Sequence, residues 1–461
     1  MDVTPRHRSA IDPGLVPAAL WTRAYLLRCA RTAGSSALTI ALRRQDGTAS
    51  LFSTQVLARG VDDVATYLHV ERTLKFLLWS RGGSEILLCG PEADHLASRL
   101  QADYAPAGCR AFDADFFRKV FERPLSFRTV KADELPVASA SHLPLGRNLD
   151  GCRIGFDLGG SDRKCAALID GKVVFSEEVK WDPYFQSDPA YHLAGIRHSL
   201  DIAASHLPRV DAIGGSSAGV YVNNKVRVAS LFRGVTDPAI FDSQVRDIFL
   251  DLAKPYGVPF EVLNDGDVTA LAGSMSLGRN AVLGVAMGTS VAAGYVDQGG
   301  NLTNWLSELA FVPVDYRQDG PADEWSGDRG CAVQYFSQQG VGRLLPLAGI
   351  RLPASMRLPE QLEELQKLQL GGDPRAAQVY EAIGIAFGYA IAHFASFYEL
   401  GCLLIMGRVT SGQGGTLIIE QARTVLRDEF PELRIDLVVP GEKDKRHGQA
   451  IAAASLPALR R

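Results

Sequence analysis

An aspartate, two glycines and a hydroxyl residue follow one another closely in one short stretch of the chain. The residues concerned are Asp157, Gly159, Gly160 and Ser161, with Lys164 just beyond them. Glycines lack a β-carbon, so they can take positive φ angles and let backbone N–H groups approach a phosphate. A carboxylate beside that phosphate can hold a magnesium ion through water. Alone, this pattern is more often an ordinary hairpin turn than a nucleotide site, so its meaning depends on the rest of the chain.

Two later turns repeat the combination of glycine and hydroxyl groups. One follows the apolar residues 281–286, and the other ends the apolar run 401–407. Such apolar runs, bounded by glycine, are typical of buried strands. We expect the earlier turn to bind phosphate and the later one to bind the base or ribose of a nucleotide. Their residues are Gly288, Thr289 and Ser290 in the first, and Gly407, Ser411 and Gly412 in the second.

Amide and acidic side chains stand where a further apolar strand ends. Asn264, Asp265 and Asp267 follow residues 259–263 directly, and open α/β sheets bind ligands at the carboxyl ends of their strands. A carboxylate there can take a proton from a substrate hydroxyl, and Asp265 and Asp267 compete for this role. The residues support equally a structural role, in which Asp265 caps the Asn-Asp-Gly turn. Gly219 lies in a turn of small residues that a ligand could approach.

The elements that must position these residues fall into two parts. Residues 1–130 are expected to form an α/β domain without an assignable motif, for which a structural or dimerising role is the simplest interpretation. Residues 131–150, rich in Ser, Pro, Ala and Gly, are expected to be a linker. In the first part the patterns predict a helix up to Arg31, strands at 36–43, 50–58 and 85–89, and helices at 62–80, 91–102 and 112–117.

From residue 151 onward, strands and helices alternate as in an α/β protein. A strand ending in Asp157 and its hairpin partner come first. The other predicted strands are 173–180, 210–215, 259–263, 281–286, 291–296, 401–407 and 435–439, and the predicted helices are 188–207, 245–254, 268–275, 332–347, 358–369, 373–399 and 448–456. Three strands followed by a helix is the opening order of the actin-like ATPase architecture.

Composition narrows the class of protein. The chain has 461 residues, enough for two to four domains, with 46% hydrophobic and 22% charged residues. A net charge of −4 gives no reason to expect nucleic acid or a membrane as the main partner. Seven cysteines without a C-x-x-C pair favour reduced thiols, and no stretch has the length of a membrane span. We therefore expect a cytoplasmic protein.

The motifs and predicted elements of residues 151–461, taken in this order, resemble those of the ROK family of repressors and sugar kinases. The motifs are Asp157 to Ser161, Asn264-Asp265, Gly288 to Ser290, and Gly407 to Gly412. The resemblance implies a two-lobed actin-like ATPase fold, related to ribonuclease H, with the additional N-terminal α/β domain in front. It also implies an ATP- and Mg²⁺-dependent, glucokinase-like sugar kinase. Apart from the resemblance, a homodimer is a further possibility. Asp265 would be the general base, and Asn264, Glu308 and Gly219 would line the sugar site.

The chain also departs from the family pattern. Where the family has Gly-His after the sugar-binding glutamate, Ala310-Phe311 follows Glu308. Of the cysteine run that binds a structural zinc, Cys331 remains, and one thiolate cannot form a closed four-ligand site, so we expect no zinc. Val333 replaces another sugar-contacting glutamate. The particular sugar therefore cannot be carried over from the family.

Two other functions remain open at this point. One is a sugar-responsive transcription repressor, since part of the family carries an N-terminal winged helix. However, the one candidate recognition helix, residues 91–100, carries two acids and one arginine, which suits DNA phosphates poorly. The other is a kinase-like protein that binds sugar or nucleotide without turnover.

Glu308 also has an alternative interpretation, as a solvated glutamate on the surface.

Overall fold

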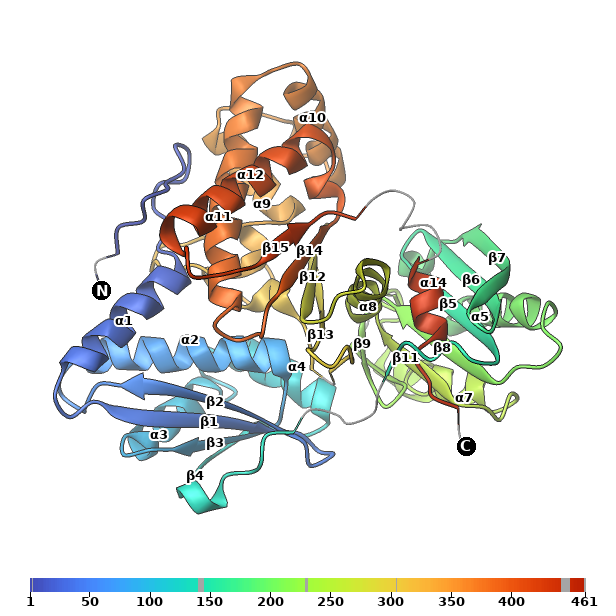
Figure 1. The fold of residues 1–461 in the computed structure, drawn as a ribbon, viewed down its shortest axis with the longest axis horizontal. Helices are drawn as coiled ribbons and strands as arrows, with labels where there is room; N and C mark the ends of the chain where they lie inside the picture. Colours follow the sequence, from blue (N-terminus) through green and yellow to red (C-terminus); the bar gives the residue numbers. More distant parts are fainter. Residues whose placement is uncertain (2, 140–144, 229–230, 304, 441–447, 460–461) are drawn as a thin grey trace.

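A computed structural model describes residues 1, 3–139, 145–228, 231–303, 305–440 and 448–459. Its elements form three main sheets: one in residues 1–130, here called the N-terminal region, and one in each of two lobes that follow. In Figure 1 the N-terminal region lies below the second lobe, and the first lobe lies beside both. The expected linker, 131–150, includes residues 140–144, which lie outside the described residues.

The N-terminal region is a four-stranded sheet covered by helices. Its elements are α1 (Ala18–Arg31), β1 (Ser36–Arg43), β2 (Ala49–Val56), α2 (Asp63–Arg81), β3 (Glu85–Cys89), α3 (Ala93–Asp103), α4 (Ala111–Phe121) and β4 (Ser126–Thr129). The strand order is β2-β1-β3-β4, with β1 antiparallel to both its neighbours. Helix α2 lies between this sheet and the second lobe and points toward the centre of the molecule (Figure 1).

The first lobe has a five-stranded sheet in the order β11-β8-β5-β6-β7. Its elements are β5 (Cys152–Leu158), β6 (Asp162–Ile169), β7 (Lys172–Lys180), α5 (Pro189–Ala204), β8 (Ala212–Ser217), β9 (Val220–Val222), β10 (Lys225–Val228), α6 (Pro238–Ile240), α7 (Ile248–Ala253) and β11 (Phe260–Asn264). Side chains alternate along a strand, so Ile154 and Phe156 share a core with Ile196 of α5 and Phe249 of α7.

The opposite face of the same sheet receives the end of the chain. Helix α14 (Gly448–Ala454) packs there so closely that a β-carbon on Gly155 would lie 1.8 Å from the carbonyl oxygen of Ala450. Glycine at this strand position is therefore required by packing rather than by backbone conformation. The C-terminal helix closes the first lobe after the chain has built the second one (Figure 1).

The second lobe has a four-stranded sheet in the order β13-β12-β14-β15. Its elements are α8 (Asp265–Leu277), β12 (Val282–Met287), β13 (Val291–Val296), the 3₁₀ turns η4 (Leu309–Phe311) and η5 (Ala332–Gln334), α9 (Gln338–Leu347), α10 (Leu358–Leu370), α11 (Pro374–Phe394), β14 (Cys402–Met406), η6 (Arg408–Thr410), α12 (Gly412–Glu429) and β15 (Asp436–Val438). Leu271 of α8 shares a core with Leu404, whereas Leu403 faces the helices α11 and α12.

The N-terminal region and the second lobe share one hydrophobic core. The cluster that contains Phe76 of α2 also contains Leu403 of β14. Phe76 stacks on Phe397 with 3.8 Å between ring centroids, and Arg81 donates a 2.7 Å hydrogen bond to the carbonyl of Phe397. Burial of large apolar side chains on both sides stabilises this arrangement. The N-terminal region is thus attached to the second lobe along α2.

Most expected elements are present, and the differences have physical causes. Strand β4 was not predicted, because four residues with mostly exposed side chains give little pattern. Helix α12 was not predicted either, since Gly412, Gly414 and Gly415 weaken the helical signal in its first turn. Helix α8 begins at Asp265 rather than at residue 268, because Asn264 caps it. The predicted helix over 332–347 is divided, and Ser337 caps its longer part.

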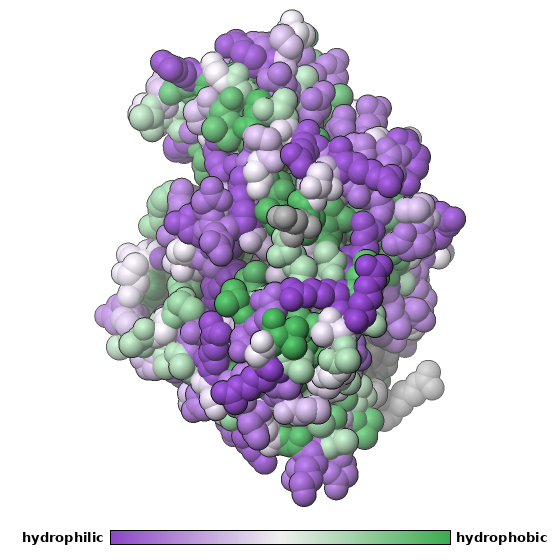
Figure 2. Space-filling model, turned by 90° about the vertical axis from the view of Figure 1, so that its left-hand side faces the viewer, coloured by the Kyte–Doolittle hydropathy of each residue, from purple (hydrophilic) through white to green (hydrophobic). Residues whose placement is uncertain are grey.

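The face in Figure 2 is mostly hydrophilic, with smaller hydrophobic areas between the charged side chains. Within the described part of the chain, no helix combines the length and hydropathy needed to cross a membrane.

Candidate active site

Three parallel strands of the first lobe bring polar residues to one edge of the sheet. Asp157 of β5 pairs in register with Ser216 of β8, and Ser217 pairs with Asn264 of β11. The Ser216 hydroxyl donates a 2.6 Å hydrogen bond to Asp157 Oδ1, and both side chains are buried. The predicted strand ends at Asp157 and Asn264 therefore meet at this edge, as ligand-binding edges of open α/β sheets do.

The turn after β5 has the predicted residues but a different backbone. Neither Gly159 nor Gly160 has a positive φ, so that expectation was wrong. Gly160 is needed for another reason: a β-carbon there would lie 2.3 Å from the ring of Tyr184. Trp181 Nε1 donates a 2.8 Å hydrogen bond to the carbonyl of Gly159. The turn is held by aromatic packing, with Ser161 exposed.

Lys164 lies opposite Asp157 on β6. Its ammonium group is 3.0 Å from Asp162 Oδ1. Burial opposes the charge of Lys164, but the carboxylates of Asp162 and Asp157 raise the pKa of the lysine above its ordinary value. The lysine is therefore a cation placed beside the buried aspartate.

Asp265 occupies the first turn of α8, where the chain passes from the first lobe to the second. Asn264 caps this helix: its Oδ1 accepts a 2.8 Å hydrogen bond from the N–H of Gly266, and its Nδ2 donates one of 2.7 Å to the carbonyl of Gly219. Asp265 Oδ1 also accepts from Gly266, at 3.0 Å. The capping role that the sequence left open for Asp265 thus belongs mainly to Asn264.

Three carboxyl groups interact where the two lobes join: Asp265 and Glu308 are half-buried, and Asp267 is buried. Burial, reinforced by the charge of Asp157, raises the pKa of Asp265 to about 6. Burial and the charge of Asp265 raise the pKa of Glu308 to about 7. The pKa of Asp267 lies well above the ordinary value because of burial and the charges of Glu308 and Asp265. Perturbed carboxyls gathered in this way are typical of catalytic sites.

The second and third turns are adjacent in the second lobe. The Gly288 N–H donates a 2.9 Å hydrogen bond to the Ser290 carbonyl, and Thr289 and Ser290 are exposed. Gly407 has a φ of 101°, and a β-carbon there would lie 2.3 Å from the carbonyl oxygen of Met287, which precedes the second turn. Ser411 precedes α12 as its N-cap. That the first turn faces these two across a cleft stays a prediction.

The residues at the sheet edge fit a magnesium ion that accompanies a nucleotide. Magnesium is usually held by one or two carboxylates together with phosphate oxygens and water. Asp157 offers such a carboxylate, and a cation there would relieve its repulsion with Asp265.

The residues of the Glu308 loop, residues 305–331, do not fit a zinc ion. Among the described residues, no group of three or more His, Cys, Asp or Glu side chains is arranged to hold a metal. Cys331 is buried, and burial raises the pKa of its thiol strongly, which opposes the thiolate that zinc requires. Val333 is buried in the core of the second lobe.

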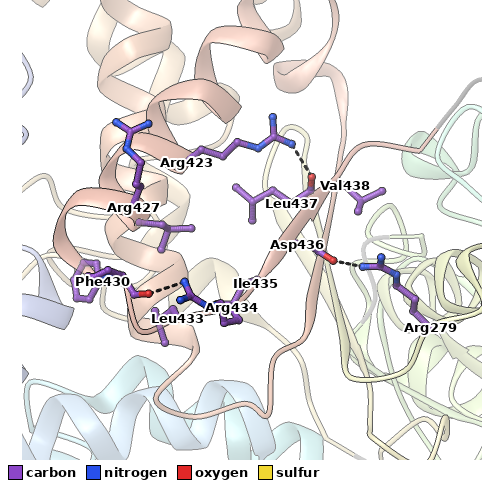
Figure 3. Close-up of a pocket in the computed structure, with 12 residues that line it drawn as sticks. Arg279, Arg423, Arg427, Phe430, Leu433, Arg434, Ile435, Asp436, Leu437 and Val438 are labelled. Atoms are coloured by element: carbon purple, nitrogen blue, oxygen red, sulfur yellow. Dashed lines mark hydrogen bonds and ion pairs between the residues drawn. The ribbon is translucent and has the colours of Figure 1, made fainter.

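A groove lined by arginines lies elsewhere, along β15 (Figure 3). Its guanidinium groups already bind oxygen atoms of the chain. Arg423 donates to the carbonyl of Leu437, Arg434 donates to that of Pro431, and Arg279 and Arg427 pair with Asp436 and Asp428. We therefore assign this groove no role in the site.

Sequence reasoning did not single out several residues that shape the site. The hydroxyl of Ser216 binds Asp157, and Tyr221 Oη lies 2.6 Å from Ser217 Oγ. The run of small residues at the end of β8 and just beyond it was the available signal for the serines. Trp79, whose carbonyl accepts a 2.9 Å hydrogen bond from the Glu308 N–H, belongs to the N-terminal region and left no signal in the sequence.

No protein-family model and no curated protein matches the sequence, but solved structures match the fold. One is a ROK hexokinase from Thermus thermophilus, with a TM-score of 0.52 and 19% identity, covering 66% of this chain and 97% of that one. Another is a ROK family transcriptional regulator, a homolog of the E. coli MLC protein, with a TM-score of 0.50 and 19% identity, covering 67% of this chain and 79% of that one. At this identity the likeness concerns the fold. About two thirds of the chain therefore has the actin-like ATPase fold of the ROK proteins.

Proposed function

We propose that this protein transfers the γ-phosphoryl group of ATP to a hydroxyl group of a sugar, with Asp265 as the general base. One observation carries the proposal: the half-buried Asp265 directly follows Asn264, whose strand end meets that of Asp157 at the sheet edge. Its carboxyl also interacts electrostatically with Asp157 and Glu308. Phosphoryl transfer needs a positioned hydroxyl, partial removal of its proton and neutralisation of charge. In this proposal Asp157 belongs to the nucleotide side and Glu308 to the sugar side, and Asp265 acts on the hydroxyl between them.

The proposed step uses the raised pKa of Asp265. The sugar hydroxyl donates a hydrogen bond to the Asp265 carboxylate, and the proton passes to it as the hydroxyl oxygen bonds to the γ-phosphorus. The bond from that phosphorus to the bridging oxygen of ADP breaks. A pKa of about 6 makes Asp265 a stronger base than an ordinary aspartate, while it stays ionised at pH 7. The products are a sugar phosphate, ADP and a proton.

The remaining residues would bind and orient the two substrates. On the sugar side, Glu308 would accept hydrogen bonds from hydroxyl groups, and Asn264 has a second amide N–H besides the one that binds Gly219. Magnesium held through water by Asp157 would neutralise phosphate charge. The proposed phosphate and adenosine contacts are Gly159, Gly160, Ser161, Lys164, Gly288, Thr289, Ser290, Gly407, Ser411 and Gly412.

A sugar-binding protein without turnover is the second candidate. It is favoured by Phe311 and Val333, which stand where the resembling family has polar residues and which pack against Trp79 and the core of the second lobe. DNA binding has less support. Helix α3 carries the acids Asp94 and Asp103 and a single arginine, Arg99, which suits DNA phosphates poorly.

The test is a phosphoryl-transfer assay with the full chain, ATP and Mg²⁺ over a panel of hexoses and N-acetylhexosamines. Mass spectrometry would detect the sugar phosphate together with ADP. Sugar-dependent ADP formation supports the kinase. Binding of a sugar without any transfer would support the second candidate instead.

A further inference from the structure

The beginning of the Glu308 loop is attached to the end of helix α2. The N–H of Ser307 donates a 2.9 Å hydrogen bond to the carbonyl of Ser80, and the N–H of Glu308 donates one of 2.9 Å to the carbonyl of Trp79. The last carbonyls of a helix have no partners inside it. The loop supplies donors to these carbonyls, so the backbone of Glu308 itself is bound to the N-terminal region.

One turn further on, the loop packs on the same helix through an aromatic pair. Phe311 stacks on Trp79, with 4.3 Å between ring centroids and 28° between planes. Trp79 is fully buried and also contacts Phe116 and Phe117 of α4, at 4.5 and 5.0 Å. Aromatic pairs of this geometry contribute beyond the area that they bury. Phe311 therefore fixes the 3₁₀ turn that follows Glu308.

The far end of the loop is held by an ion network. Asp328 contacts three cations of the N-terminal region: Arg72 at 2.9 Å, Lys75 at 3.1 Å and Arg110 at 2.6 Å. Two further carboxylates complete the network. Glu71 binds Arg72 and Arg110, and Asp113 binds Lys75. Three carboxylates thus balance three cations. Although burial opposes it, the charges of Lys75 and Arg72 hold the pKa of Asp328 below its ordinary value.

We infer that α2 takes the place of a metal as the element that positions the Glu308 loop. The loop lacks the donor set for zinc, yet both of its ends are attached to one rigid helix. Trp79, Lys75, Phe311 and Asp328 are positioning residues: they act on a substrate through Glu308. This inference rests on the proposed function, because it gives the N-terminal region a part in the binding of the acceptor sugar.

If α2 positions the loop, loosening the loop should affect the two substrates differently. A displacement of about 1 Å in a binding group is enough to weaken binding or catalysis strongly. Loosening the loop should therefore weaken sugar binding, whereas the nucleotide contacts in the other turns are attached to different elements. A merely structural role for α2 would instead lower stability without separating the two substrates.

The test compares two phenylalanines at the same interface. Phe311 and Phe52 are both partly buried, and each stacks across it, Phe311 on Trp79 and Phe52 on Phe397 at 4.9 Å. Phe52 lies outside the loop. In the full chain, we expect Phe311→Ala to raise the KM for sugar about tenfold and to change the Kd for Mg·ATP less than about twofold. We expect Phe52→Ala to leave both constants unchanged and Phe311→Tyr to restore the sugar KM.

Hydrogen exchange provides a readout that does not need turnover. The amides of Ser307 and Glu308 should exchange at least about tenfold faster in Phe311→Ala, and at the original rate in Phe52→Ala. Unchanged exchange in Phe311→Ala would overturn the inference, as would faster exchange with an unchanged sugar KM. If exchange changes as expected but the unaltered protein binds and phosphorylates no sugar, the attachment of the loop stands and the proposed function fails.

Discussion

The hydroxyl of Ser216 donates a 2.6 Å hydrogen bond to the buried carboxyl of Asp157. Burial raises the pKa of Asp157, and this hydrogen bond lowers it. The bond therefore helps to keep Asp157 ionised, the state that a magnesium ion needs. It links two neighbouring strands at the point where the first phosphate turn begins.

Ser216→Ala should destabilise the protein more at pH 8 than at pH 5. Without the hydrogen bond the pKa of Asp157 rises further, so the ionised form becomes more costly at high pH, while protonation relieves that cost at low pH. We expect the loss of unfolding free energy to be about 1 kcal/mol larger at pH 8. Denaturant unfolding at both pH values measures it.

Ser217→Ala is the matched control for this prediction. Ser217 is the next residue, equally buried, and its hydroxyl bonds to the neutral Tyr221 hydroxyl rather than to a carboxylate. The loss of unfolding free energy in Ser217→Ala should not depend on pH in this range. Equal pH dependence in the two variants would contradict the assigned state of Asp157.

The rate of phosphoryl transfer should fall as the pH drops through about 6. Asp265 must be ionised to accept a proton, and burial with the nearby Asp157 raises its pKa to about 6. Below this pKa, kcat/KM should decrease about tenfold for each pH unit. This decrease is the acidic limb of the pH–rate profile, which is measured from about pH 4.5 to 8.5. A limb near the ordinary aspartate value would show that the proton is accepted by a different, unperturbed group.

Gly407→Ala should destabilise the second lobe by about 2–4 kcal/mol and weaken Mg·ATP binding. A side chain there must adopt a φ of 101° and collide with the Met287 carbonyl at 2.3 Å, next to the second turn. Gly372→Ala, outside the proposed nucleotide contacts, is the control, because its φ of 77° brings strain but nothing lies within 4 Å of the added β-carbon. Unfolding free energies and calorimetric binding of Mg·ATP would distinguish the variants. Equal losses of both quantities would refute the role given to the close contact.

Removal of metal should leave the fold intact. Because α2 rather than zinc holds the Glu308 loop in this account, dialysis against a chelator should shift the thermal midpoint by less than about 1 °C. Elemental analysis of the purified protein should find no stoichiometric zinc. Stoichiometric zinc whose removal unfolds the loop would contradict this account.

The sequence predicted the parts of the site that local patterns encode. Strand ends, glycine turns and the Asn-Asp pair depend on neighbouring residues, and the register of β5, β8 and β11 then brings Asp157 and Asn264 to one edge. The φ angles of Gly159 and Gly160 were predicted wrongly, since the requirement for glycine at 160 comes from Tyr184, a packing contact that the turn itself does not show.

The attachment of the N-terminal region could not be predicted. Asp328 binds Arg72, Lys75 and Arg110 over more than 200 residues of sequence, and such pairs have no periodicity to recognise. The N-terminal sheet also differs from that of the first lobe in strand direction. Strand β3 runs antiparallel to β1, whereas β8 runs parallel to β5. The N-terminal sheet is therefore not a copy of that lobe.

Asp265 is the central residue of the proposed reaction, and Asp265→Asn tests its role most directly, with Asp267→Asn as the neighbouring comparison. With a sugar that the unaltered protein phosphorylates, we predict that Asp265→Asn lowers kcat by at least about 10²-fold. Binding of Mg·ATP and sugar should persist, and Asp267→Asn should retain more activity. Full activity in Asp265→Asn, or a larger loss in Asp267→Asn, would contradict the assignment of Asp265 as the general base.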